Sequence, residues 1–223
     1  MKKKILSFIF FVVVLALPYS VFAGEQKPVN LVFAREKSVC NCLLEKLNSD
    51  ISRYGNIQYA KHPEFITDNW TKLGQPKGGD PISQEIYRCN FDEIMKIDIN
   101  NDNAKEYILR HTTCLSGVPS HSLFIYRNKG DAINYQKTKP LFSIDHTGDF
   151  LDFEVFIEDK KENLKVSLGG MFTIIPFKYM GVNYILISDK TKYKDTIGKW
   201  IVLTKLSQEF ENEVQCVFDN NYK

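Results

Sequence analysis

Residues 86–114 read IYRCNFDEIMKIDINNDNAKEYILRHTTC, and in this stretch two runs rich in β-branched and aromatic residues flank a polar loop. The runs Ile86–Ile97 and Tyr107–Cys114 have the composition of strands, and the Asn- and Asp-rich segment between them is typical of a turn. If the turn is centred on that segment, residues whose numbers sum to 203 face each other, so Ile97 opposes Glu106. The stretch therefore predicts an antiparallel hairpin with a definite register.

The loop of this hairpin places oxygen atoms at alternate positions. Counting Asp98 as position 1, side-chain oxygens fall at positions 1, 3, 5 and 9, and a backbone carbonyl is available at position 7. The candidate metal ligands are Asp98, Asn100, Asp102, the Ala104 carbonyl and Glu106. Calcium prefers six to eight oxygen ligands, so this set with one or two waters predicts a Ca²⁺ site. The alternative is a plain hairpin turn, in which Lys96 and Lys105 neutralise the acids without a metal.

The same loop resembles the calcium loop of FG-GAP (VCBS-type) repeats, which carry an Asp-x-Asp/Asn-x-Asp-Gly-x-x-Asp/Glu pattern between strands of β-propeller blades. It is also similar to the loops of dockerins. The resemblance covers Asp98–Glu106 and occurs once, whereas propellers repeat the motif. Asn103 stands where those families have Gly, and Asn is the non-glycine residue that best tolerates a left-handed backbone. An EF-hand is disfavoured because position 12 is Leu109, where a bidentate Glu is required.

The rest of the chain predicts one helix and many strands. Apolar residues recur at helical spacing from Cys40 to Ile51, with Ser38 as the expected N-cap and Gly55 as the stop, which predicts a helix over about 38–54. Further strands are expected at Val29–Ala34, Ser122–Tyr126, Leu141–Ile144, Phe150–Ile157, Leu164–Leu168, Met171–Pro176, Tyr184–Ser188, Lys199–Leu206 and Val214–Phe218.

Turn residues between these strands refine the expected fold. Gly169-Gly170 and, more weakly, Gly181-Val182 are hairpin signals, and Pro176 indicates an edge strand or a break. We expect a mainly β fold (α+β by count of elements), as an antiparallel sheet sandwich or a propeller-like partial barrel with one N-terminal helix. No internal repeat supports a closed propeller.

Residues 1–23 have the features of a cleaved signal peptide. Lys2–Lys4 form a basic start, Ile5–Leu17 an apolar run, and Val21-Phe22-Ala23 a small-residue cleavage site. The run is too short for a transmembrane anchor, which needs about 20 residues. We therefore expect a secreted or periplasmic protein with a single mature domain over residues 24–223 and no stable membrane insertion after cleavage.

Five cysteines follow this leader, and export favours disulfides over catalytic thiols. The hairpin register opposes Cys89 and Cys114 and predicts a bond between them. By elimination, Cys216 would pair with Cys42 or with Cys40. Because five is an odd number, one cysteine is left over.

Composition excludes several classes of function. The chain is 43% hydrophobic and 25% charged, which is typical of a globular protein. Without Lys2–Lys4 it carries 26 basic against 27 acidic residues, so no nucleic-acid partner is expected. No phosphate-binding glycine loop or dinucleotide fingerprint occurs, and calcium is therefore the only cofactor predicted.

Catalytic motifs are also missing from the sequence. The four histidines lie outside any HExxH motif, and no GxSxG elbow occurs. A hydrolytic site would have to gather distant residues such as His121, His146, Asp149 and Glu154. The segment Lys190–Trp200 mixes lysines with Tyr193 and Trp200, which are candidate partner-binding residues, although a solvated loop explains the segment as well.

These observations favour an exported, non-enzymatic binding protein of the inhibitor or immunity type. It would present loops such as Leu115–His121 or Lys190–Trp200 to a protein or glycan partner in or outside the cell envelope. The alternatives are a cell-envelope hydrolase with a site assembled by folding and a calcium-stabilised structural or adhesion module.

Overall fold

The computed structural model describes residues 29–74, 90–115, 118–145, 151–169, 171–190 and 197–220. This part of the chain is mostly β and contains two five-stranded antiparallel sheets, a two-stranded ribbon and one long helix. The expected mainly β, antiparallel fold with an N-terminal helix is confirmed, and the sheets stay open rather than closing into a barrel. The signal-peptide prediction for residues 1–23 lies outside the described residues.

Sheet A joins the N-terminal strand to the C-terminal half of the chain. Its strand order is β1 (Val29–Ala34), β12 (Asn212–Asn220), β11 (Ile197–Leu206), β10 (Val182–Lys190) and β9 (Phe172–Tyr179). The proline at position 176 lies in β9, at the edge of the sheet, where a residue without a backbone N–H costs no ladder hydrogen bond. The expectation of an edge strand at Pro176 is confirmed.

Sheet B contains the hairpin predicted from the sequence. Its order is β2 (Thr71–Leu73), β3 (Phe91–Ile97), β4 (Glu106–Leu115), β5 (Val118–Tyr126) and β6 (Phe142–Ile144). Ile97 pairs with Glu106, and the predicted register holds along β3 to its first residue, which pairs with Thr112. The short strand β2 lies in a stretch whose Gly and Pro content is typical of a loop, so sequence patterning missed it.

The ribbon consists of β7 (Leu151–Ile157) and β8 (Glu162–Leu168), which pair only with each other. The hairpin expected at Gly169-Gly170 is therefore wrong, because β8 belongs to the ribbon and the next strand, β9, belongs to sheet A. The hairpin expected near Gly181 is present one residue earlier. Met180 and Gly181 both have positive φ, 48° and 87°, as a tight two-residue hairpin turn requires.

The helix α1 spans Lys37–Tyr54 and ends at Gly55, whose left-handed φ of 72° closes the last turn. The predicted N-cap is wrong by two residues, because Glu36 holds the cap position and makes no side-chain cap bond. The buried stripe of α1 includes Cys40, Leu43 and Leu47, all fully buried against sheet A. Two shorter helices follow, η1 (Tyr59–Lys61) and α3 (Lys129–Ile133).

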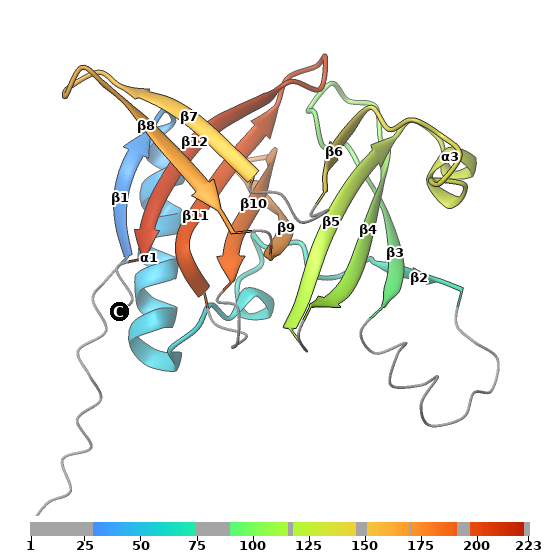
Figure 1. Ribbon diagram of the computed structural model, residues 1–223, viewed down its shortest axis with the longest axis horizontal. Coiled ribbons are helices and arrows are strands. Elements are labelled where there is room, and N and C mark those ends of the chain that lie inside the picture. Colours follow the sequence, from blue (N-terminus) through green and yellow to red (C-terminus); the bar gives the residue numbers. More distant parts are fainter. Residues whose placement is uncertain are drawn as a thin grey trace, which may run out of the picture.

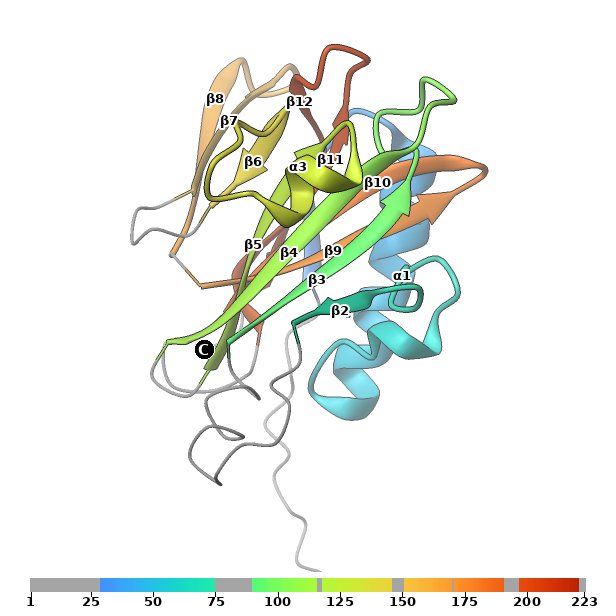
Figure 2. The same ribbon diagram turned by 90° about the vertical axis from the view of Figure 1, so that its right-hand side faces the viewer.

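Sheet A is the central layer of the molecule. Alternate residues of β11 point to opposite faces, so Ile201 and Leu203 pack under α1 while Val202 and Leu206 face the other sheets. On that second side the inner face of sheet B and the ribbon share one apolar core with sheet A. Figure 1 shows the ribbon crossing sheet A, with α1 behind it and sheet B beside it, and Figure 2 shows α3 on the outer face of sheet B.

Within the described ranges, no helix is long and apolar enough to cross a membrane.

Candidate functional site

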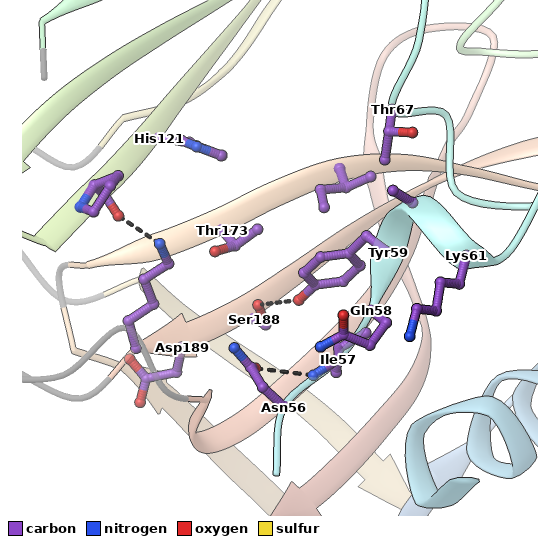
Figure 3. Close-up of a pocket in the computed structure, with 14 residues that line it drawn as sticks. Asn56, Ile57, Gln58, Tyr59, Lys61, Thr67, His121, Thr173, Ser188 and Asp189 are labelled. Atoms are coloured by element: carbon purple, nitrogen blue, oxygen red, sulfur yellow. Dashed lines mark hydrogen bonds between the residues drawn. The ribbon is translucent and has the colours of Figure 1, made fainter. Parts of the chain in front are cut away.

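A cleft of about 550 Å³ lies at the end of sheet A that α1 leaves uncovered. Residues 56–61, which follow α1 and include η1, form one wall, the start of β5 forms another, and β9 and β10 form the floor (Figure 3). Volumes of this size are typical of pockets for small molecules or for an inserted side chain.

The floor carries two hydroxyl groups and one apolar side chain. Thr173 on β9 pairs directly with Ser188 on β10, and Ile175 is the next β9 residue on the same face. All three are at least nine-tenths buried. The Tyr59 hydroxyl, from the wall that includes η1, lies 3.0 Å from Ser188 Oγ. This hydrogen bond attaches η1 to the floor (Figure 3).

The β5 wall is attached to sheet A by side chains rather than by a strand ladder. Ser120 Oγ accepts a hydrogen bond from the Phe172 amide at 3.0 Å, and His121 Nδ1 accepts one from the Ile174 amide at 3.1 Å. These bonds satisfy the edge N–H groups of β9 and join sheet B to sheet A. Because His121 Nδ1 is an acceptor, the imidazole is neutral with its proton on Nε2.

Two charged residues of the cleft, Lys190 and Asp189, are engaged with the backbone. Lys190 Nζ donates to the Pro119 carbonyl at 2.6 Å. Asp189 accepts backbone N–H groups from Gly169, Lys190 and Lys199, while burial raises the pKa of its carboxyl group. Among the described residues Ser188 bonds to Tyr59 and to neither His121 nor a carboxylate.

The predicted calcium loop has a well-defined hydrogen-bonding pattern in the structure. The Asp98 carboxylate accepts the amides of Asp102 and Asn103, both at 3.0 Å. Asp102 in turn accepts the Ala104 amide at 2.7 Å and an N–H of the Asn100 side chain at 3.0 Å. Asn103 has a φ of 70°, as expected for the position where the resembling families have Gly.

The loop is also attached to sheet A. Asn101 and Asn183 exchange two hydrogen bonds, of 3.1 and 2.7 Å, and Asn183 Nδ2 donates to the Asp98 carbonyl at 2.7 Å. Asn100 donates to the Gln208 carbonyl in the turn before β12. The β3–β4 loop thus connects two turns of sheet A.

Glu106 is the one loop acid that is buried, with 4% of its surface exposed. It accepts the Ile99 amide at 3.1 Å, and burial, followed by the negative charges of Asp102 and Asp98, raises the pKa of its carboxyl group. No group of three or more His, Cys, Asp or Glu side chains within the described ranges is arranged to hold a metal ion. Calcium binding by this loop stays a prediction.

The cysteine pairing differs in part from the prediction. Cys216 is bonded to Cys40, and Cys42 is a free, half-buried thiol, so the pairing with Cys42 is wrong and the pairing with Cys40 is correct. Cys40 lies in the buried stripe of α1, whereas Cys42 lies two residues further around the helix. Cys114 is disulfide-bonded, and the predicted partner, Cys89, lies outside the described residues.

The other predicted site residues do not form a group. Trp200 packs against the core between the sheets, with Lys199 Nζ 4.5 Å from its ring centroid. Its ring is therefore used in packing, and Tyr193 lies outside the described residues. Of the four residues considered for hydrolysis, His121 lines the cleft and Glu154 is exposed on the ribbon opposite Lys165. His146 and Asp149 lie outside the described residues.

A polar row on the outer face of sheet B was missed. Asp92 of β3 pairs with His111 of β4, which pairs with Ser122 of β5. His111 Nδ1 donates to Asp92 at 2.6 Å, and Ser122 Oγ donates to Asp145 at 2.9 Å. Ser122 is fully buried, so the row is not an accessible nucleophile. The register that opposes Ile97 and Glu106 also opposes Asp92 and His111, and this signal was available in the sequence.

Comparison with protein-family models, with curated proteins and with solved structures gives no match for this chain.

Proposed function

We propose that the chain is an exported, non-enzymatic binding protein that takes its partner at the cleft between η1, β5 and the floor of β9 and β10. The observation that carries this proposal is the preformed cleft of about 550 Å³, in which hydrogen bonds to the backbone hold the Lys190 and Asp189 side chains in place. Rigid walls reduce the conformational entropy lost on binding and so favour affinity.

The segments expected to contact a partner support this location. Leu115–His121 contributes Pro119 to the cleft, and Lys190–Trp200 contributes its first residue. The two segments are joined where the Lys190 ammonium group meets the Pro119 carbonyl. A partner seated in the cleft would touch both.

The chemistry of the cleft supports binding over hydrolysis. A general base must be within hydrogen-bond reach of a nucleophile or a water. His121 Nδ1 already accepts a hydrogen bond from the Ile174 amide, and the Asp189 carboxylate already accepts hydrogen bonds from three backbone amides. Export is supported by the leader-like segment Met1–Ala23 and by the Cys40–Cys216 disulfide, which is typical of oxidising compartments.

The test uses the mature chain, residues 24–223, as immobilised bait for an envelope extract, read by mass spectrometry. Ala60 is exposed at the rim of the cleft, so Ala60→Trp adds bulk there without disturbing a buried side chain. Asp159→Trp, in the exposed turn of the ribbon and away from the cleft, is the matched control. We expect the wild type and the control to retain the same partner and Ala60→Trp to lose it. Equal retention by Ala60→Trp would overturn the proposal.

A further inference from the structure

The charged groups around the cleft already make contacts within the protein. Lys61, which lines the cleft, has its Nζ 3.6 Å from the centroid of the Tyr54 ring. Lys190 donates to Pro119, and Asp189 is held by backbone amides. A strongly charged ligand would have to displace one of these contacts, so the cleft favours a neutral ligand.

Neutral polar groups remain for such a ligand. Thr173 is 9% exposed, and neither its hydroxyl nor the side-chain amide of Gln58 has a hydrogen-bond partner within the described part of the chain. The Thr173 hydroxyl is not among the fully buried polar atoms without a partner, so it is open to the cleft and available to a ligand there. The hydroxyl pair of Tyr59 and Ser188 lies beside it (Figure 3).

A peptide main chain does not fit this site, because the backbone edges beside the cleft are occupied. An extended peptide binds a sheet edge through main-chain hydrogen bonds. The edge amides of Phe172 and Ile174 are taken by Ser120 and His121, and the Lys190 amide is shared between the Met171 carbonyl and the Asp189 carboxylate. The ligand is therefore recognised through its own hydroxyl or amide substituents.

Apolar surface completes the site. Ile57 and Ile175, each 5% exposed, line the cleft with Tyr59, whose ring is held edge-on by Phe65 at a centroid distance of 5.1 Å. The cleft thus offers an aromatic ring and aliphatic groups beside hydroxyls and an amide, and this mixture complements a ring that has an apolar face and a rim of hydroxyl groups.

We infer that the cleft binds a neutral saccharide, whose ring packs on Tyr59 and Ile175 and whose hydroxyls bond to Thr173, Gln58 and Ser188. This inference rests on the proposed function and names the ligand class of the same site. A glycan of the cell envelope, free or carried by a partner protein, supplies this chemistry.

The test is titration of the isotope-labelled mature chain with neutral trisaccharides of N-acetylglucosamine, glucose and galactose, followed by amide NMR and calorimetry. We expect at least one sugar to shift the amides of Thr173, Ser188 and Gln58. A neutral Gly/Ser tetrapeptide is the negative control. Thr173→Val removes the hydroxyl and keeps the shape of the side chain, so the dissociation constant should rise about three- to tenfold.

Thr71→Val, on the exposed face of β2, is the matched control and should leave the dissociation constant unchanged. Absence of cleft shifts with all three sugars at millimolar concentration would overturn the saccharide inference. So would an unchanged dissociation constant in Thr173→Val. The proposed function would survive either result if Ala60→Trp still lost its envelope partner, so the two failures are distinguishable.

Discussion

Cys40 and Cys216 form a disulfide that joins the buried face of α1 to β12, with their Cα atoms 5.6 Å apart and 176 residues between them in sequence. Both side chains are fully buried in the core under α1. The bond therefore holds the only long helix of the described residues against β12, next to the β1 edge of sheet A, and closes most of the chain into one loop.

Replacing this pair should destabilise the fold strongly. A cross-link over a long loop restricts the unfolded chain, and removing a native disulfide from a small exported domain costs about 2–5 kcal/mol. We expect Cys40→Ala/Cys216→Ala to lower the free energy of unfolding by that amount in urea titrations. Cys42→Ser changes only a half-buried thiol and should stay within about 0.5 kcal/mol of wild type. Similar losses in both variants would contradict the structure.

The Asp92–His111 pair should make stability depend on pH. The hydrogen bond that His111 donates to Asp92 raises the pKa of His111, and the negative charges of Asp92 and Asp145 act in the same direction. A raised folded-state pKa means that the stabilisation is complete below the unfolded value of about 6.5 and is lost as the pH rises through the folded value. We therefore expect the free energy of unfolding to fall above about pH 6.5.

His111→Gln isolates this contribution. The variant cannot carry the charge, so its stability should change less than that of the wild type over the same pH window. Urea titrations on either side of the window measure the difference. Parallel curves for the two proteins would show that His111 does not gain a proton on folding.

Local patterns predicted the β3–β4 hairpin and the end of α1 well. The register follows from a short turn and a period of two, and Gly55 is the residue that best adopts a left-handed cap. The buried stripe of α1 also contained the information to prefer Cys40 over Cys42. These features depend on neighbouring residues, which a sequence displays directly.

Pairing between strands that are distant in the sequence was harder to predict from the sequence. Gly169-Gly170 has the composition of a hairpin turn, yet the chain there leaves the ribbon and enters sheet A, because both β8 and β9 bury apolar residues in the core between the sheets. The cleft combines residues near positions 57, 120, 173 and 189. None of its polar groups belongs to a recognisable sequence motif. Only tertiary packing brings them together, so the sequence did not reveal the cleft.

Asp98 should be the main support of the β3–β4 loop. Its carboxylate accepts two backbone amides, and hydrogen bonds to charged groups are the stronger class. Because Asp98 is only half-buried, we expect Asp98→Ala to cost about 1–2 kcal/mol in the free energy of unfolding. Asp159→Ala, at an exposed position in the ribbon turn, is the matched control and should cost about 0.5 kcal/mol or less.

The calcium prediction for the same loop has a separate test. A specific site stabilises the folded state in proportion to the logarithm of ligand concentration, so the melting temperature should rise with calcium and fall with chelator. Asp102→Ala should abolish the calcium dependence. An unchanged melting temperature across millimolar calcium would remove the metal site and leave a turn held by its own hydrogen bonds.

Any side chain at Gly198, beside the cleft, should lower the stability of the fold. A Cβ atom at this position would lie 2.6 Å from the carboxylate of Asp189, which cannot move aside without losing its three backbone amides. We expect Gly198→Ala to cost about 1–3 kcal/mol in urea unfolding, as overpacking does, and to shift the amide resonances of Asp189 and Lys190. Gly130→Ala is the matched control, because its added Cβ would lie an acceptable 3.4 Å from Asn128.

A double-mutant cycle identifies the cause of the loss. Once Asp189→Ala has removed the carboxylate, Gly198→Ala no longer meets the closest atom, so its additional cost should fall well below its cost in the wild type. Purely additive costs would place the strain elsewhere in β11. A coupled result would show that the glycine leaves room for the buried carboxylate, and that the carboxylate fixes the backbone where β10 reaches the cleft.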